Sequence, residues 1–226
     1  MYSACDLPSR HLLSIIMEID QVKAVKARGR PLSFDREQAL EKAMHVFWQR
    51  GYEAASVAEL TAAMGITAPS LYTAFGDKEH LFLAAIERYA NGPAAGYPLA
   101  LEEEATAYAA IRRLLLEAAE ELTRDNQPKG CMIAMAATNC SQASAHIQAA
   151  LIKRREAGMT GIRCRIECGI GREELPSTTD AAALATFYAT VYRGMALQAA
   201  DGASRENLIG VAEAAMRAWP GEVPKA

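Results

Sequence analysis

The feature that most constrains this chain is a pair of short helical segments within residues 56–75, each bounded by residues that start or stop helices. Residues 56–59 read SVAE, the spacing of a capping box, in which a serine hydroxyl and a glutamate carboxylate accept hydrogen bonds from each other's backbone amides. Gly65 can adopt the left-handed conformation that ends a helix, and Thr67 can cap the next helix. Pro69 is tolerated there because first-turn amides have no intrahelical acceptor. The sequence therefore predicts two short helices joined by a tight corner.

Longer helices are expected on both sides of this corner. The first runs from about Asp35 to Arg50 with Ser33 as its N-cap, and Gly51 supplies a left-handed residue at its end. Its apolar residues recur every three or four positions, at Leu40, Ala43, Met44 and Phe47. The helix after the corner is capped by Asp77, and its apolar stripe comprises Leu81, Phe82, Ala85, Ile86 and Tyr89. These helices can bury one shared core.

The rest of the chain is also predicted to be helical. Hydrophobic residues make up 51% of the sequence and aromatic residues only 7%, and alanine is abundant, which favours packed helices over sheets. Asn91-Gly92-Pro93 interrupts the pattern, so we place a boundary near residues 91–98. The helices expected beyond it are Leu99–Arg124, Ser144–Cys168 with a bend at Gly158 or Gly161, Thr179–Ala200 and Arg205–Trp219.

Charge and surface chemistry indicate that the first part binds DNA. The net charge is −3, so a surface for nucleic acid must concentrate its positive charge locally. No acidic residue lies between Val22 and Ser33, and the basic residues nearby are Lys23, Lys26, Arg28 and Arg30. In the second short helix Leu71 and Phe75 face inward, which leaves a hydroxylated outer face suited to a major groove about 12 Å wide. The alternative is a plain helical bundle in which this helix is a connector.

The segment GITAPSLYTAFGDKEHLF, residues 65–82, favours the first interpretation. With the sequence around it, this segment resembles the DNA-binding domain of TetR-type (tetracycline-repressor-like) regulators. The resemblance implies an all-α fold, with an N-terminal three-helix helix-turn-helix DNA-binding domain joined by a helix to an all-helical ligand-binding and dimerisation domain. We therefore expect a flexible leader and basic arm at 1–32, the helix-turn-helix domain at 33–91, and the effector-binding and dimerisation domain at 92–226.

The resemblance also implies partners and the positions that face them. The expected partners are double-stranded DNA with a palindromic operator, a second copy of the chain, and a small apolar or aromatic effector that releases a repressor from DNA. The positions expected to contact base edges and the groove are Thr67, Ala68, Ser70 and Thr73. Ser56, Tyr72 and Lys78 are expected to contact phosphates. Arg28 and Arg30 are expected to add electrostatic affinity. The recognition helix has no Arg, Asn or Gln for bidentate pairing, so specificity should depend on thymine methyls, water and DNA shape.

The second part is expected to hold the effector and the dimer contacts. Candidate effector-binding residues are Met132, Met135, Met159, Phe187, Tyr188, Tyr192 and Met195. For any one of them, ordinary core packing is the alternative. The resemblance places dimerisation on the last two helices, as a four-helix bundle, and small residues such as Ala183 and Gly194 permit close packing there. The alternative is that these residues fill the core of a monomer.

Cysteine chemistry offers a different mode of control. The five cysteines are odd in number and scattered, which argues against a disulfide framework. Cys164 and Cys168 share a helix face, Arg163 and Arg165 could lower a thiol pKa, and further ligands could come from Cys131, Cys140 and His146. A thiol- or metal-responsive regulator is therefore an alternative, although the spacing is not that of a dedicated zinc site. We expect no bound metal or cofactor.

Other classes of function are disfavoured by the sequence. The four histidines are not accompanied by a nucleophile elbow, a glycine-rich phosphate loop or metal-ligand spacing, so we do not expect an enzyme. No run reaches the roughly 20 apolar residues that span a bilayer, so we expect a cytoplasmic protein with no membrane partner. A DNA-binding protein without effector control remains a further alternative.

Overall fold

The computed structural model describes residues 34–221, and within this range the chain forms helices and no strand. The α-helices are α2 (Arg36–Ala54), α3 (Val57–Met64), α4 (Ala68–Phe75), α5 (Lys78–Asn91), α6 (Gly96–Glu103), α7 (Ala107–Glu121), α8 (Met132–Met135), α9 (Ala145–Gly171), α10 (Ala181–Ala200) and α11 (Arg205–Met216). A 3-10 turn, η2, spans Gln142–Ser144. The all-α fold is as predicted. The leader and basic arm, including Arg28 and Arg30, lie outside the described residues.

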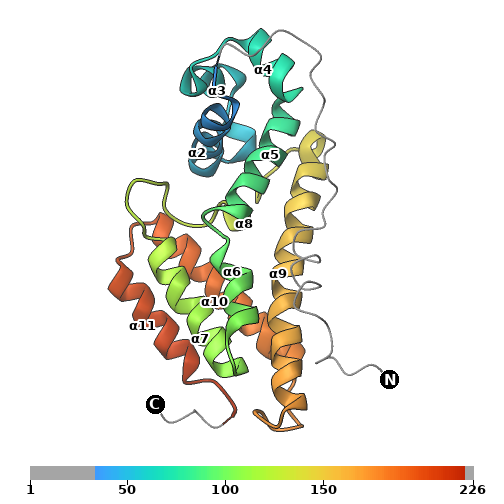
Figure 1. Cartoon of the computed structure of the whole chain (residues 1–226), viewed down its shortest axis with the longest axis vertical. Helices are drawn as coiled ribbons and strands as arrows, with labels where there is room; N and C mark the ends of the chain where they lie inside the picture. Colours follow the sequence, from blue (N-terminus) through green and yellow to red (C-terminus); the bar gives the residue numbers. More distant parts are fainter. Residues whose placement is uncertain (1–33, 222–226) are drawn as a thin grey trace.

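The helices form two groups along the long axis of the molecule (Figure 1). Helices α2, α3 and α4 form one end, and α6, α7, α10 and α11 pack together at the other. Helix α5 leads from the first group toward the second, and α8 lies where the two groups meet. Helix α9 runs along the side of the molecule, from the level of α5 down to the far end of the second group.

The caps predicted around the tight corner are confirmed. The Ser56 hydroxyl accepts a hydrogen bond from the Glu59 amide at 3.1 Å, and the Glu59 carboxylate accepts one from the Ser56 amide at 3.0 Å. Gly65 ends α3 in the left-handed conformation, with φ 72° and ψ 31°. Thr67 caps α4 and Asp77 caps α5, as expected. Hydrogen bonds between residues three positions apart thus define the corner.

Helix α2 differs from the prediction at both ends. Its N-cap is Asp35, whose carboxylate accepts hydrogen bonds from two first-turn amides at 2.9 and 3.1 Å, and Ser33 lies outside the described residues. At the other end Gly51 interrupts the helix with the expected positive φ of 74° (ψ 173°), and a further helical stretch to Ala54 follows across this kink. The Tyr52 amide beyond the kink donates to the Ala136 carbonyl at 2.8 Å. The kink therefore docks α2 onto the segment that follows α8.

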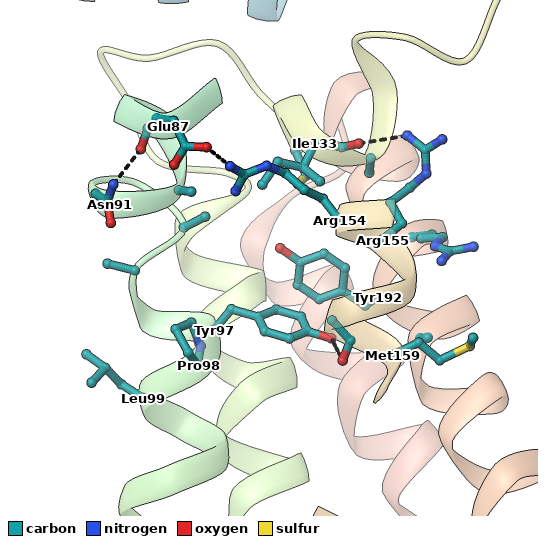
Figure 2. Close-up of a pocket in the computed structure, with 18 residues that line it drawn as sticks. Glu87, Asn91, Tyr97, Pro98, Leu99, Ile133, Arg154, Arg155, Met159 and Tyr192 are labelled. Carbon is teal, nitrogen blue, oxygen red and sulfur yellow. Dashed lines mark hydrogen bonds and ion pairs between the residues drawn. The ribbon is translucent and has the colours of Figure 1, made fainter. Parts of the chain in front are cut away.

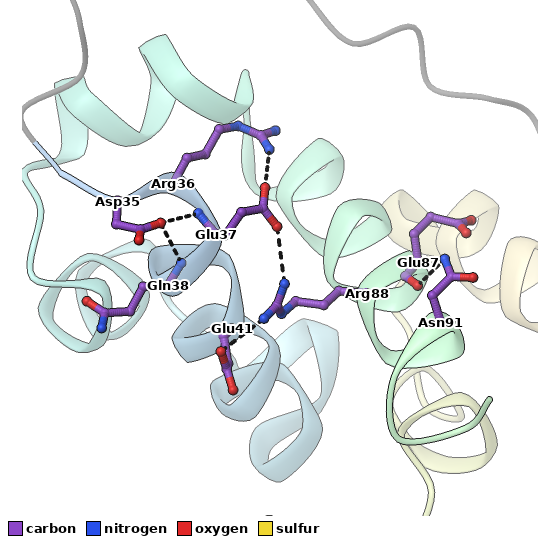
Figure 3. Close-up of polar contacts among 8 residues, drawn as sticks. All are labelled: Asp35, Arg36, Glu37, Gln38, Glu41, Glu87, Arg88 and Asn91. Carbon is purple, nitrogen blue, oxygen red and sulfur yellow. Dashed lines mark hydrogen bonds and ion pairs between the residues drawn. The ribbon is translucent and has the colours of Figure 1, made fainter. Parts of the chain in front are cut away.

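An aromatic core and an ion-pair network join α2 to α5. The ring of Phe82 packs edge-on against those of Phe47 and Tyr52, each at 5.0 Å between centroids. Such pairs contribute about 0.5–1.5 kcal/mol each beyond the area that they bury. On the surface, Arg88 of α5 binds the carboxylates of Glu37 and Glu41 at 3.1 and 3.0 Å (Figure 3). Helices α2 and α5 are thus coupled both inside the core and at its edge.

The single helix predicted over Leu99–Arg124 is wrong. The chain instead forms α6 and α7, separated by extended backbone at Glu104, with φ −77° and ψ 143°. The Thr106 hydroxyl caps α7 by accepting the Ala109 amide at 3.1 Å. The Ala107 amide also donates to the Glu174 carboxylate at 2.6 Å. The break is stabilised partly by a residue far along the chain, so helical periodicity alone did not reveal it.

The long helix α9 is continuous where a bend was considered. It spans 27 residues and passes through both Gly158 and Gly161 with no break. An added Cβ at Gly158 would lie 3.4 Å from the Tyr97 hydroxyl oxygen, an ordinary van der Waals contact. Neither glycine therefore bends α9.

Candidate nucleic-acid interface and effector cavity

The recognition helix α4 separates its residues into a buried and an exposed face. Leu71 and Phe75 are buried against the core, with 0% and 7% of their surface exposed. Tyr72 is 52% exposed and Thr73 is exposed, while Ser70 and Ala68 are half-buried. The residues expected to face DNA on this helix therefore lie on or beside its solvent face.

Hydroxyl groups on this face already have partners within α4. The Thr67 and Ser70 hydroxyls lie 2.9 Å apart, and the Thr73 hydroxyl donates to the Pro69 carbonyl at 2.8 Å. A threonine that donates in this way offers a partner its methyl group and the acceptor lone pairs of its hydroxyl oxygen. This chemistry suits thymine methyls and water-mediated contacts better than bidentate base pairing.

The phosphate-contact candidates differ in how free their polar atoms are. Tyr72 projects into solvent, whereas the Ser56 hydroxyl is part of the capping box. The Lys78 ammonium lies 3.4 Å from the Glu53 carbonyl and 4.5 Å from the centre of the Tyr52 ring. Burial lowers the pKa of Lys78. Lys78 is thus held in place at the start of α5.

A cation beside α4 was missed by the sequence analysis. The Arg36 guanidinium lies 4.6 Å from the centre of the Phe75 ring, where the start of α2 meets the end of α4. An arginine in the first turn of a helix opposes the helix dipole, which is a signal that it has another partner. Arg36 also contacts the Glu37 carboxylate at 3.4 Å (Figure 3), so its charge beside the recognition helix is partly compensated.

A cavity of about 250 Å³ lies between α5 and α6 on one side and α8, α9 and α10 on the other (Figure 2). Its walls are mostly apolar and include Ala90, Ala94, Leu99, Ile133, Ala134 and Ala189. Tyr97 and Tyr192 meet edge to face at 5.2 Å between centroids, and the Tyr97 hydroxyl donates to the Gly158 carbonyl at 3.2 Å. The charged residues that line the cavity are Glu87, Arg154, Arg155 and Arg193.

The cavity contains two of the seven expected effector-binding residues. Met159 and Tyr192 line it. Met132, Tyr188 and Met195 are buried in the core at 0–1% exposure, and Met135 is half-buried. Phe187 is 40% exposed on the surface of α10. Neighbouring positions on one helix face different helices, so a list of apolar residues does not separate a cavity wall from the core.

The cavity arginines were missed, although the sequence contains a signal for one of them. The buried face of α9 includes Ile147, Leu151 and Ile162, and two arginines, Arg154 and Arg165, interrupt this apolar pattern. Arg154 forms an ion pair with Glu87 of α5, and burial lowers the pKa of Arg154. A buried charge is costly without a partner, so Arg154 depends on the carboxylate of Glu87.

The segment from Gly130 to Ser141 connects the cavity with α2. The Trp48 indole donates to the Gly130 carbonyl at 3.2 Å, and the Glu53 carboxylate accepts two hydrogen bonds from Ser141 at 2.8 Å. Hydrogen bonds from Ser144 and Ser141 lower the pKa of Glu53 to about 2. The same segment thus lies against both the cavity and α2.

The Cys131 thiol lies where this segment meets the cavity. It is 3% exposed, lines the cavity, and lies against the hydroxyls of Tyr89 and Tyr192. Tyr89 packs edge-on against Trp48 at 4.7 Å between centroids. A continuous set of packed side chains thus extends from the cavity wall to α2.

The structure does not favour a thiol or metal centre at Cys164 and Cys168. Both are half-buried and form no disulfide, and burial raises the pKa of Cys164 by more than Arg163 lowers it. A raised pKa reduces the fraction of reactive thiolate. Within residues 34–221 no group of three His, Cys, Asp or Glu side chains could hold a metal ion. No helix in the same range is long and apolar enough to cross a membrane.

The fold and the interface define a helix-turn-helix regulator with a second, helical domain, and comparisons with known proteins identify its family. Residues 39–85 match the family described as bacterial regulatory proteins, tetR family. The chain is 37% identical over 209 residues to the HTH-type transcriptional repressor ComR of Escherichia coli (strain K12), a match that covers 90% of this chain and 98% of ComR. The chain therefore belongs to the TetR family of transcriptional regulators, which bind DNA and are not enzymes.

Solved structures agree with this assignment. A cysteine mutant of the TetR family regulator CifR, complexed with 26 bp double-strand operator DNA, is 43% identical with a TM-score of 0.82, and the match covers 85% of this chain and 100% of CifR. A TetR regulator from Rhodococcus sp. RHA1 is 34% identical with a TM-score of 0.57, over 83% of this chain and 100% of that protein.

Proposed function

We propose that this protein is a homodimeric transcriptional repressor that binds a palindromic operator and is released by a small molecule bound in the cavity. The similarity to ComR, which is named as a repressor, and to CifR, whose mutant was solved on operator DNA, supports the first half of this proposal. Residues 33–91 would form the DNA-binding domain and residues 92–226 the effector-binding and dimerisation domain. Within the first domain, α3 and α4 would contact DNA.

Effector control is supported by one observation above all, namely that α5 belongs to both sites. Glu87 of α5 lines the cavity, while the next residue, Arg88, binds the two carboxylates of α2. Adjacent residues of one helix thus contact the effector site and the DNA-binding helices. A ligand that prefers one position of α5 would shift the equilibrium between DNA-binding and released states, with a coupling typically of about 1–3 kcal/mol.

Dimerisation is supported by an exposed apolar face on the last two helices. Phe187 and Leu197 of α10 are 40% and 52% exposed, and Val211 of α11 is 41% exposed. Gly194 and Gly210 lie nearby in the sequence and have open space where a side chain would be. A helix-turn-helix monomer covers one half-site, so a second copy on this face would supply the other.

Binding to the DNA upstream of the protein's own gene tests the proposal. Fluorescence anisotropy at fixed salt should give tighter binding to that DNA than to a shuffled duplex of equal length and composition. Typical specific affinities exceed non-specific ones by about 10³–10⁷. Equal affinity for both duplexes would contradict operator binding. A mass of the DNA complex that corresponds to two dimers on each duplex would instead contradict the binding of one dimer to each operator.

A further inference from the structure

Guanidinium groups outnumber carboxylates around the cavity. Arg154, Arg155 and Arg193 line it together with one carboxylate, that of Glu87. Figure 2 shows Arg154, Arg155 and Glu87 at the same end of the cavity, near Ile133, and the rings of Tyr97 and Tyr192 below them. The Arg155 guanidinium donates a hydrogen bond to the Ile133 carbonyl at 3.0 Å. Arg193 is exposed, whereas Arg154 is buried and Arg155 half-buried, so two cations are sheltered beside one carboxylate.

The charge of Arg154 is the least hydrated of the three. Its side chain is 7% exposed, while its partner Glu87 is 44% exposed. Burial lowers the pKa of Arg154, and burial followed by the nearby Arg193 lowers that of Arg155. A guanidinium presents five N–H donors in a planar fork that matches a carboxylate. An additional anion in the cavity would therefore stabilise both charges.

We propose that the effector is an organic monoanion that carries a carboxylate on an apolar body. Its carboxylate competes with that of Glu87 for the Arg154 guanidinium and displaces it. This inference rests on the proposed function, since it names the ligand class of that same cavity. A volume of about 250 Å³ exceeds the roughly 150 Å³ of a cavity that holds benzene, so a monocyclic aromatic or medium-chain acid fits. The apolar walls and the edges of Tyr97 and Tyr192 would contact the body of such an acid.

Competition for Arg154 gives the acid a way to act on DNA binding. Two side-chain contacts join α5 to α9, a hydrogen bond between Glu79 and His146 at 2.8 Å and the ion pair of Glu87 with Arg154. They are eight residues apart on both helices, so the two helices run in the same direction side by side. Loss of the pair at the cavity leaves α5 held to α9 mainly at its first turn. The other end of α5 can then move, and the recognition helix with it.

Matched acids and amides test this assignment. The probes are 3-phenylpropionate and octanoate, each beside its primary amide, and binding is measured by calorimetry on the full chain. The wild type should bind at least one acid at least tenfold more tightly than its amide. Arg154→Gln should lose that preference. Arg163→Gln removes an arginine from the same helix that pairs with Glu167 outside the cavity, and it should leave the preference unchanged.

Glu87→Gln provides an independent variant that keeps Arg154. Without the competing carboxylate, the acids should bind several-fold more tightly than they bind the wild type, and the amides should bind as before. Weaker acid binding by Glu87→Gln would overturn the competition for Arg154. Equal binding of acids and amides by the wild type, or undiminished acid binding by a folded Arg154→Gln, would overturn the anion assignment itself.

The test separates this inference from the proposed function. If the chain binds its operator and both acids bind no better than their amides, the anion assignment fails and the repressor stands. If the chain does not prefer operator DNA, the repressor fails, and acid binding at Arg154 is still measured by calorimetry. Release of operator DNA by the acid, but not by its amide, would support both.

Discussion

At the scale of single residues, contacts divide the predicted DNA-binding set into those with free polar atoms and those held in place. The Tyr72 hydroxyl projects from an exposed side chain, while Lys78 is held between the Glu53 carbonyl and the Tyr52 ring. Ser70 and Thr73 are tied to their own helix. We therefore expect phosphate contacts to supply most of the affinity and base contacts a smaller share.

Tyr72→Phe and Lys78→Ala should weaken binding to all DNA sequences by similar factors. Loss of one neutral hydrogen bond at Tyr72 corresponds to about 0.5–1.5 kcal/mol. Loss of the Lys78 charge should reduce the slope of log affinity against log salt by about one. Anisotropy titrations at several salt concentrations measure both effects, with Lys153→Ala on α9 as the control.

Changes at Ser70 and Thr73 should instead alter sequence preference. Thr73→Val keeps the methyl group and removes the hydroxyl, and Ser70→Ala removes a hydroxyl alone. A panel of operator variants with single base-pair changes measures the effect, about 1–3 kcal/mol for each disrupted position. If both variants bind every operator as the wild type does, α4 does not read bases directly.

The backbone at Gly51 lies against Ala136, in the segment that follows α8. Gly51→Ala should lower the free energy of unfolding by about 1–3 kcal/mol, because φ is 74° and the new Cβ would lie 3.0 Å from the Ala136 carbonyl oxygen. Gly65→Ala is the matched control, with φ 72° and open space around it. Urea denaturation should show a smaller loss for Gly65→Ala. Equal losses would mean that the contact with Ala136 contributes nothing.

At the scale of elements, the end of α2 and the segment around η2 form a joint that depends on ionisation. Glu53 accepts hydrogen bonds from Ser141, and hydrogen bonds from Ser144 and Ser141 lower its pKa to about 2 from an ordinary value of 4.5. A lowered native pKa means that the ionised carboxylate stabilises the fold. Its contribution is fully present above about pH 5 and is lost as the pH falls toward 2.

Glu53→Gln should therefore destabilise the protein at pH 7 and matter progressively less as the pH falls. The difference in melting temperature between wild type and variant should shrink between pH 5 and pH 2. Glu156→Gln removes an exposed carboxyl of α9 outside this joint and is the control. A difference that stays constant over the whole range would show that the Glu53 charge is not coupled to folding.

At the scale of the whole molecule, the exposed face of α10 and α11 is the place where a second copy would pack. The same two helices contribute to the monomer core on their other side, where Tyr188, Met195 and Leu208 are buried. The alternatives of dimer contact and monomer core thus apply to different faces of the same helices. The four-helix bundle remains a prediction that the exposed face supports.

If the proposed dimer packs on this face, Leu197→Glu should convert it to a monomer, because a carboxylate would replace an apolar side chain that is 52% exposed there. Sedimentation equilibrium should give half the wild-type mass, and operator affinity should fall at least tenfold. Ile152→Glu is matched in chemistry, since Ile152 is 41% exposed on α9 and lies outside that face. It should remain dimeric. A dimeric Leu197→Glu would place the interface elsewhere.

The sequence by itself determined the local structure of this protein and the fold class. The capping box at Ser56, the left-handed Gly65 and the cap at Thr67 are specified by hydrogen bonds between residues a few positions apart, so their spacing is visible in the chain. The apolar stripes of α2 and α5 likewise predicted which faces pack together. The family resemblance of residues 65–82 then indicated a DNA-binding transcriptional regulator.

Tertiary structure alone decided the cavity, the joint between the domains and the break between α6 and α7. Each depends on partners far apart in sequence: Trp48 reaches Gly130 across 82 positions, and Glu174 supplies the acceptor for the start of α7 across 67. The spacing of neighbouring residues along the chain does not reveal such pairs. The interruption of the α9 stripe by Arg154 indicated an unusual position, but only the packed helices showed that Glu87 and two further arginines surround the same cavity.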